Sequence, residues 1–429
     1  MSYENLAGLI IVILLIASLI ARSRRPQTPV WSIMAFLSFI TILFRLVRPD
    51  ELDNVIDLDV ILFLIGMFSI VGLAEASGVL EAISTWFISH FKSRYAVIYA
   101  SSILFGLLAA IAMNDTVAFM GPPIAYTIAR AIDVDPKAMF LLLAFSLTIG
   151  SVTTPIGNPQ NVLIAERSGL EAPFIRFVNY LIIPTIINLL ITPYIIIKYF
   201  RIENKRVQIA LVPHEAIKDR REALLGAIGL LSSIAALIVN DVLQIMGLPY
   251  ISKRGFIPFI IAAALYIMSR NPRRVLSNVD WGTIIFFITM FITMEGVWRS
   301  GVLNPLLNIF IPRKLSGIMD ILSITAASIV VSQIISNVPF TKLVIDYMKS
   351  LGYASNDQLS WITLAMATTI AGNLTLLGAA SNIIIIEYLE SKMSTSISFT
   401  EFLKIGVIVT AVNTLIYLAL LWVPAIALH

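Results

Sequence analysis

Two short polar motifs interrupt apolar stretches of the sequence in which charge is otherwise almost absent. They consist of Asn114, Asp115 and Thr116, and of Ser336, Asn337 and Pro339. Amides and hydroxyls can hydrogen-bond an oxygen-rich solute, and a carboxylate can bind a proton or share in a sodium site. Asp115 is the only acid in the two motifs, because Val338 stands at the corresponding place in the second. The alternative is a tight turn between two helices, with Asp115 at the surface.

Two further segments combine helix-breaking residues with polar side chains. Pro155 and Pro159 remove backbone donors, and Gly157 between them weakens any helix. The flanks are apolar, and an unwound backbone at membrane depth is tolerated only where it lines a cavity or is buried in protein. The candidate binding residues of these segments are Thr153, Thr154, Pro155, Gly157, Asn158, Gln160, Asn161, Gly372, Asn373, Thr375, Gly378, Ser381 and Asn382. The alternative is a kinked helix with a structural role.

Enzymatic chemistry is not expected from this sequence. The chain has no cysteine, which excludes disulfides, thiolate metal sites and a cysteine nucleophile. The histidines at 90, 214 and 429 all fall in loops or at the terminus, so no histidine metal cluster is expected. No hydrolase or metalloprotease motif lies in an apolar stretch. We therefore expect no enzyme and no cofactor; sodium or a proton is the expected ion.

The elements that must position these motifs are membrane-spanning helices. Of the 429 residues, 58% are hydrophobic and 13% are charged, and the mean hydropathy is +0.90. A soluble protein carries about 25% charged residues. Apolar stretches such as 6–20, 178–197 and 405–426 are each near the roughly 20 residues that a helix needs to cross a bilayer. The sequence predicts an all-α polytopic membrane protein, with its net charge of +4 in loops and not in a nucleic-acid-binding stripe.

The chain contains an internal duplication. Residues 57–80 and 280–303 align without gaps at an offset of 223 and share ten identities. The same offset pairs Asn114 with Asn337, and farther along the chain the offset is 221. Unrelated apolar helices would share leucines, but not polar and turn residues in register. The predicted organisation is a first repeat at 1–200, a cytoplasmic linker at 201–222 and a second repeat at 223–429.

Each half is expected to cross the membrane five times. Three plain spans precede a re-entrant hairpin, which enters and leaves on one side, and a broken span and a final span follow. Hairpins are expected at 95–129 and 318–349, and broken spans at 138–167 and 360–389. Because five is odd, the second half must be inverted relative to the first, as in many secondary transporters.

The charges of the loops predict the orientation in the cell membrane. If the N-terminus is external, the internal loops carry 18 lysine and arginine residues and the external loops carry 9. Positive residues favour the cytoplasmic side. We expect both termini and residue 171 outside, and residue 214 inside.

The four motifs, taken in order, resemble the ion transporter superfamily, most closely its branch of arsenite permeases and citrate-transporter-like anion permeases. The matching segments are Asn-Asp-Thr at 114–116, Thr-Pro-Ile-Gly-Asn-Pro-Gln-Asn at 154–161, Ser-Asn-Val-Pro-Phe at 336–340 and Gly-Asn-Leu-Thr-Leu-Leu-Gly-Ala-Ala-Ser-Asn at 372–382. The resemblance covers essentially the whole chain. It implies that each re-entrant tip meets an unwound helix to form the binding site. The sodium/dicarboxylate branch carries Ser-Asn-Thr at both tips, a pattern that this sequence lacks.

These observations predict a secondary active transporter of a small anion or oxyacid, coupled to protons or sodium. The resemblance and the residue types together favour outward transport of arsenite or antimonite. The motifs lack Arg and Lys, whereas a multiply charged carboxylate favours an arginine clamp. The alternatives are a citrate or dicarboxylate transporter, a transporter of another inorganic anion, and a sodium/proton antiporter; a channel or an intramembrane enzyme is disfavoured. Expected partners are the bilayer, a second copy of the chain (which the resemblance implies) and a soluble ATPase if the protein belongs to an arsenite pump, but no nucleic acid.

Overall fold

The computed structural model describes residues 2–24, 28–207, 216–393 and 396–427, and its named elements in these ranges are all helices. The first half contains α1 (Tyr3–Arg24), α2 (Val30–Leu43), η1 (Pro49–Glu51), α3 (Leu52–Val55), α4 (Leu58–Ala76), α5 (Val79–Ile88), α6 (Arg94–Ala112), α7 (Asn114–Ala131), α8 (Pro136–Ser151), α9 (Pro159–Arg167) and α10 (Pro173–Tyr199). The second half contains α11 (Arg220–Ile245), α12 (Phe256–Met268), α13 (Pro272–Ser277), α14 (Trp281–Ser300), α15 (Asn304–Phe310), α16 (Gly317–Ile335), α17 (Asn337–Ser350), α18 (Gln358–Ile370), η3 (Ala371–Asn373), η4 (Leu376–Gly378), α19 (Ala380–Met393) and α20 (Phe399–Ala427). The all-α class predicted from the sequence is confirmed.

Each segment predicted to form a hairpin consists of two helices joined by a turn at a single residue; that the hairpins are re-entrant stays a prediction. Met113 separates α6 from α7 with φ 65° and ψ 141°, and Ser336 separates α16 from α17 with φ 72° and ψ 152°. A residue other than glycine rarely adopts such a conformation, which costs about 1–3 kcal/mol. The break therefore comes one residue before the position expected for the first motif, and Asp115 lies in the first turn of α7.

The two broken spans are unwound where the sequence predicts. Between α8 and α9 the chain leaves the helix for residues 152–158, and Asn158 caps α9 by accepting a hydrogen bond from the Asn161 amide at 2.9 Å. Pro159 is the first residue of α9, a position where the missing amide hydrogen costs nothing. Between α18 and α19 only the short 3-10 helices η3 and η4 intervene.

Residues that align between the two halves have the same local role. Asp57 and Asp280 each accept backbone amide hydrogens at the start of α4 and α14. Gly78 and Gly301 follow the ends of these helices and both adopt a positive φ, of 84° and 66°. These equivalences extend the sequence alignment to backbone structure. The inversion of one half relative to the other stays a prediction.

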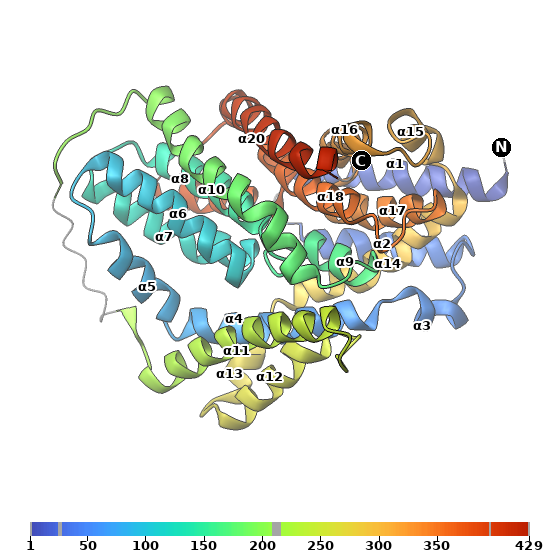
Figure 1. Ribbon diagram of the computed structural model, residues 1–429, viewed down its shortest axis with the longest axis horizontal. Coiled ribbons are helices and arrows are strands. Elements are labelled where there is room, and N and C mark those ends of the chain that lie inside the picture. The colour runs from blue at the N-terminus through green and yellow to red at the C-terminus, as the bar shows by residue number, and fades with distance from the viewer. Residues whose placement is uncertain (1, 25–27, 208–215, 394–395, 428–429) are drawn as a thin grey trace.

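The helices pack into two groups that meet around the polar motifs (Figure 1). One group, which we call the motif group, contains α6 to α10 and α16 to α20, and its hairpins and broken helices pack on one another. The other, the flanking group, contains α1 and α2 packed on α14, together with α4 packed on α11 and α12. Contacts between the groups include α14 with α17 and α4 with α7 and α9.

Eight of the described helices are long and apolar enough to cross a membrane, namely α1, α4, α6, α10, α11, α14, α16 and α20. Two further apolar helices are shorter than these eight: α2 has 14 residues and ends at Leu43, and α12 has 13 residues. At 1.5 Å per residue each is roughly 20 Å long, less than the roughly 30 Å of a bilayer core. The predicted number of crossings stays a prediction.

Four stretches that were expected to be loops contain helices. These are α3, α5, α13 and α15. In α5 one face is buried through Leu80 and Ile88, while Trp86 is exposed. A short amphipathic helix of this kind buries one face against the neighbouring spans and leaves the other face exposed. These helices are too short to span the bilayer, so a hydropathy pattern of membrane-spanning length does not mark them.

Candidate functional site

A cavity of about 490 Å³ lies between the motif group and the flanking group. From the motif group, both hairpin tips and the beginnings of α9 and α19 form its walls. From the flanking group, the end of α1 and the beginnings of α2 and α14 complete it. A pocket of this volume between helices is within the range of small-molecule sites, roughly 300–1,000 Å³.

Four helix N-termini of the motif group converge on this cavity. Asn114 of α7, Gln160 of α9, Asn337 of α17 and Ala380 of α19 all line it, each within the first two residues of its helix. The first amides of a helix have no partner within the helix, and the helix dipole places partial positive charge at this end. The cavity therefore offers several backbone donors and a favourable potential to oxygen atoms that carry negative charge.

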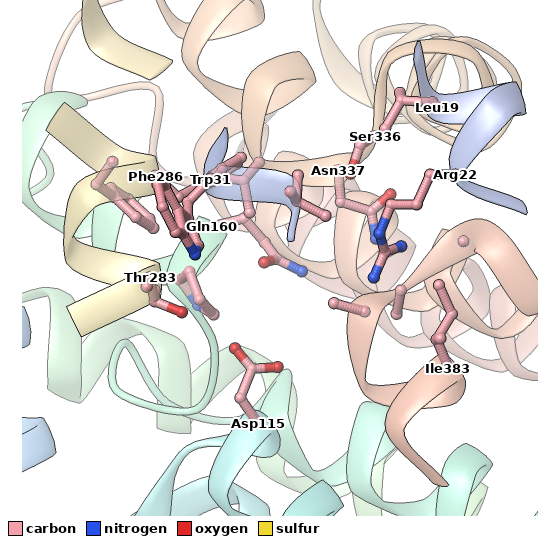
Figure 2. A pocket seen from close by; sticks show the side chains of 18 of the residues that line it. Leu19, Arg22, Trp31, Asp115, Gln160, Thr283, Phe286, Ser336, Asn337 and Ile383 are labelled. Carbon is pink, nitrogen blue, oxygen red and sulfur yellow. The ribbon is translucent and has the colours of Figure 1, made fainter. Parts of the chain in front are cut away.

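Three charged side chains face the same space. Figure 2 shows Asp115 on one side of the cavity, Arg22 beside Asn337 on another, and Gln160 pointing into the space between them. The Arg22 Nε donates to the Thr28 carbonyl oxygen at 3.0 Å, which holds the guanidinium at the cavity wall. Asp280, the cap of α14, also lines the cavity.

The hairpin tips contribute a matched pair of amide oxygens. Asn114 and Asn337 are about 95% buried, and the Oδ1 atom of each has no hydrogen-bond partner among the described residues. An unpartnered buried carbonyl oxygen is costly, and such groups in native proteins call for a ligand, ion or water. Both side chains line the cavity, so these oxygens are candidate ligands for a cation or acceptors for a solute hydroxyl.

Hydrogen bonds hold each tip against an unwound segment. The backbone amide of Asn114 donates to the Gly157 carbonyl oxygen at 2.8 Å, and the Thr154 hydroxyl donates to the Ala110 carbonyl oxygen in α6. In the second half, Gln333 Nε2 donates to the Ala371 carbonyl oxygen at 3.0 Å, and the Thr375 hydroxyl donates to Gln333 Oε1 at 2.9 Å. Tip and unwound segment therefore form one unit in each half.

Two buried asparagines at aligned positions hold the unwound segments in shape. Asn161 Nδ2 donates to the carbonyl oxygens of Ser151 and Thr154 at 3.0 and 2.9 Å. Asn382 Nδ2 donates to the carbonyl oxygens of Gly372 and Thr375 at 2.8 and 3.3 Å. The four acceptors correspond to one another at the offset of 221 that the sequence indicates. These side chains replace the hydrogen bonds that the unwound backbone has lost.

Replacing either asparagine by alanine will destabilise the protein. Each substitution removes two hydrogen bonds to backbone carbonyl oxygens of an unwound segment, at about 0.5–1.5 kcal/mol each. We expect Asn161→Ala and Asn382→Ala to lower the melting temperature of the detergent-purified protein and to reduce transport, whereas Asn54→Ala, at an exposed position of α3, changes neither. An unchanged melting temperature in both variants would contradict this role.

The structure divides the predicted site residues into wall and support. The predicted residues that line the cavity are Asn114, Asp115, Gln160, Ser336, Asn337 and Gly378. Those that lie behind this wall are Thr153, Thr154, Pro155, Gly157, Asn158, Asn161, Pro339, Gly372, Asn373, Thr375, Ser381 and Asn382. Thr116 lines a smaller neighbouring cavity of about 240 Å³ together with Glu75, Asp115 and Asp280. That these residues bind a substrate or ion stays a prediction.

Sequence reasoning missed several residues of the wall. Arg22 stands among the loop charges that predict the orientation, and Asp280 is the first residue of the aligned segment 280–303, although both line the cavity. Trp31 and Thr283 lie in the flanking group, at the beginnings of α2 and α14, and carry no local signal. Gln333, a polar residue one turn before the tip of an apolar helix, is the one that the sequence pattern alone would have found.

The fold and the cavity define a class: a multi-pass helical membrane transporter, in which hairpin tips and broken helices enclose a polar site between two groups of helices. The chain belongs to the citrate transporter family, whose family model, CitMHS, matches residues 9–371. It is a membrane transport protein and not an enzyme.

Curated relatives span almost the same length. An uncharacterized transporter of Mycobacterium tuberculosis is 28% identical over 382 residues, which are 86% of this chain and 87% of the relative. The transporter arsB of Dictyostelium discoideum is 23% identical, with 85% and 82% covered. The silicon efflux transporter LSI3 of Oryza sativa subsp. japonica is 23% identical, with 81% and 82% covered.

Among solved structures, the crystal structure of the YdaH transporter of Alcanivorax borkumensis resembles this fold. The TM-score is 0.50, the sequence identity is 11%, and 98% of each chain is covered. At this identity the similarity concerns the fold alone.

Proposed function

We propose that the protein is a secondary active transporter of a small oxyacid, with export of arsenite or antimonite as the favoured activity. The observation that carries this proposal is the convergence of four helix N-termini on one cavity that also contains Arg22, Asp115 and Asp280. The N-termini and Arg22 donate hydrogen bonds, whereas the two carboxylates accept them. A solute that presents both oxygen lone pairs and hydroxyl groups satisfies both sets.

The side-chain charges of the cavity wall favour an uncharged solute over a multiply charged anion. If Asp115 and Asp280 are both ionised, the two carboxylates and the Arg22 guanidinium give the described cavity wall a net charge of −1. Arsenite at neutral pH is an uncharged trihydroxide, whose hydroxyls can donate to Asp115 and Asp280. The names of the relatives from Dictyostelium and rice, arsB and a silicon efflux transporter, support a solute of this kind.

Expression in an arsenite-sensitive cell that lacks its own arsenite pump tests this proposal. We expect increased resistance to arsenite and lower cellular arsenic, with no gain from Asp115→Asn expressed at the same level. If the wild-type chain reaches the membrane but changes neither quantity, the substrate belongs to another class, to be identified by a substrate and counter-ion screen in proteoliposomes.

Citrate-like carboxylates are the second candidate. The family model is described as citrate transporter, and Arg22 supplies the guanidinium that the four motifs lack. A guanidinium binds carboxylate groups through paired hydrogen bonds. Competition between citrate and arsenite for transport in proteoliposomes discriminates between the two candidates.

In this proposal, transport of the substrate is coupled to the movement of sodium ions or protons. The unpartnered Oδ1 atoms of Asn114 and Asn337 are hard oxygen donors suited to sodium, and Asp115 can bind either sodium or a proton. These groups lie on both tips, so an ion bound there would interact with both repeats.

The proposed orientation in the plasma membrane places both termini outside. Because the natural chain has no cysteine, single cysteines at 171 and 214 can be labelled without background. Residue 214 lies outside the described residues, and residue 171 lies between α9 and α10. We expect an impermeant reagent on intact cells to label residue 171 and not residue 214; the opposite pattern would reverse the orientation.

A further inference from the structure

A cluster of charges around the buried Lys342 joins α14 to α17 outside the substrate cavity. Lys342 is fully buried, and its Nζ donates to Glu295 Oε2 at 2.7 Å across the interface between these helices. Nζ also lies 2.7 Å from Asp346 Oδ2, in a charge contact whose geometry is not that of a hydrogen bond. Glu295 in turn accepts from Arg299 Nε at 2.9 Å. We call Glu295, Arg299, Lys342 and Asp346 the charge clasp.

The clasp connects two walls of the cavity. Asp280 and Thr283, at the beginning of α14, line one wall, and Asn337, at the beginning of α17, lines another. Lys342 lies five residues beyond Asn337 in the same helix, so its contact with Glu295 fixes the second hairpin tip relative to the flanking group.

The arrangement of partners allows the contact across the interface to open. Removing one partner of a buried ion pair leaves an uncompensated charge, which is strongly destabilising. Here, however, each helix carries its own i,i+4 pair, Glu295 with Arg299 and Lys342 with Asp346. If the helices separate, Glu295 keeps Arg299 as its partner and Lys342 keeps Asp346.

Further charges surround the clasp and keep it balanced. Arg299 also pairs with Glu51 of η1, and Arg167 Nη2 of α9 lies 3.8 Å from Asp346 Oδ1. The four clasp residues and these two neighbours comprise three basic and three acidic side chains. A balanced network can exchange partners without burying net charge.

We infer that the charge clasp is a reversible latch, which positions the second hairpin against α14 in the present conformation and opens during each transport cycle. The inference rests on the proposed function, because it assumes that access to the cavity alternates between the two sides of the membrane. The alternative is a static salt bridge, in which α14 and α17 stay together throughout the cycle.

The first test measures conformation and needs no substrate. A single cysteine replaces Ile334, which lines the cavity, and an impermeant thiol reagent labels it in right-side-out and inside-out vesicles. In the Lys342→Met/Glu295→Gln background, we expect the ratio of the two labelling rates to change at least about fivefold, the effect of about 1 kcal/mol. The Lys314→Met/Asp357→Asn background, which removes a different salt bridge, should leave this ratio unchanged. An unchanged ratio in the clasp variant would overturn the latch.

The second test prevents the latch from opening. Cysteines at 295 and 342 are joined by a flexible bifunctional thiol reagent that reduction releases. Arsenite transport is measured before cross-linking, after cross-linking and after reduction. We expect the cross-link to reduce transport at least tenfold and reduction to restore it, while each single cysteine and a cross-linked 314/357 pair remain active. Full transport by the cross-linked protein would establish a static bridge. If arsenite is not transported even before cross-linking, the proposed substrate fails, while the labelling ratio still decides whether the latch exists.

Discussion

Asp115→Asn will abolish ion-driven accumulation of substrate while leaving the protein folded. The substitution preserves the shape of the side chain, but an amide cannot take up a proton and is a weaker ligand for sodium than a carboxylate. Asp115 lies in the first turn of α7 and lines both the main cavity and its smaller neighbour. We expect accumulation in proteoliposomes to fall to the level of empty vesicles.

A coupling role is distinguished from a binding role by measuring exchange. If Asp115 couples transport to an ion, the variant should still exchange labelled for unlabelled substrate across the membrane without an ion gradient. Asp133→Asn is the matched control, because that side chain is 96% exposed and pairs with Arg94 away from the cavity. Accumulation by the Asp115 variant with unchanged dependence on pH and sodium would exclude Asp115 as the coupling residue.

Arg22→Gln is expected to raise the KM for substrate by about tenfold to a hundredfold, with little loss of folded protein. A hydrogen bond to a charged group contributes about 1.5–3 kcal/mol, which corresponds to this range. The Arg22 guanidinium is anchored on Thr28 and faces the cavity beside Asn337, as Figure 2 shows. Its loss removes the only cationic side chain of the described cavity wall.

The control for Arg22 is another arginine that was also counted among the loop charges. Arg48 is 66% exposed and pairs with Asp50, so Arg48→Gln should leave the KM unchanged. An Arg22 variant with normal KM but altered orientation in the membrane would show that Arg22 acts only as a topology signal, as the sequence first indicated.

The sequence by itself determined the all-α membrane class and the positions at which the helices break. Hydropathy, proline and glycine act over a few residues, so Pro155, Gly157 and Pro159 predict an unwound segment without knowledge of its neighbours. The duplication is also a property of the sequence, and it predicts that Asn161 and Asn382 are equivalent. Hydrogen bonds to corresponding carbonyl groups agree with this equivalence.

Only the tertiary structure decided which of these residues form the cavity wall and what else joins them. Arg22 lies more than three hundred residues before Asn337, and no local pattern records that the two meet. For the same reason no local pattern places Lys342, whereas the structure buries it against Glu295. Contacts of this kind depend on how separate helices pack, which the hydropathy of each helix does not specify, because an apolar face can pack against many partners.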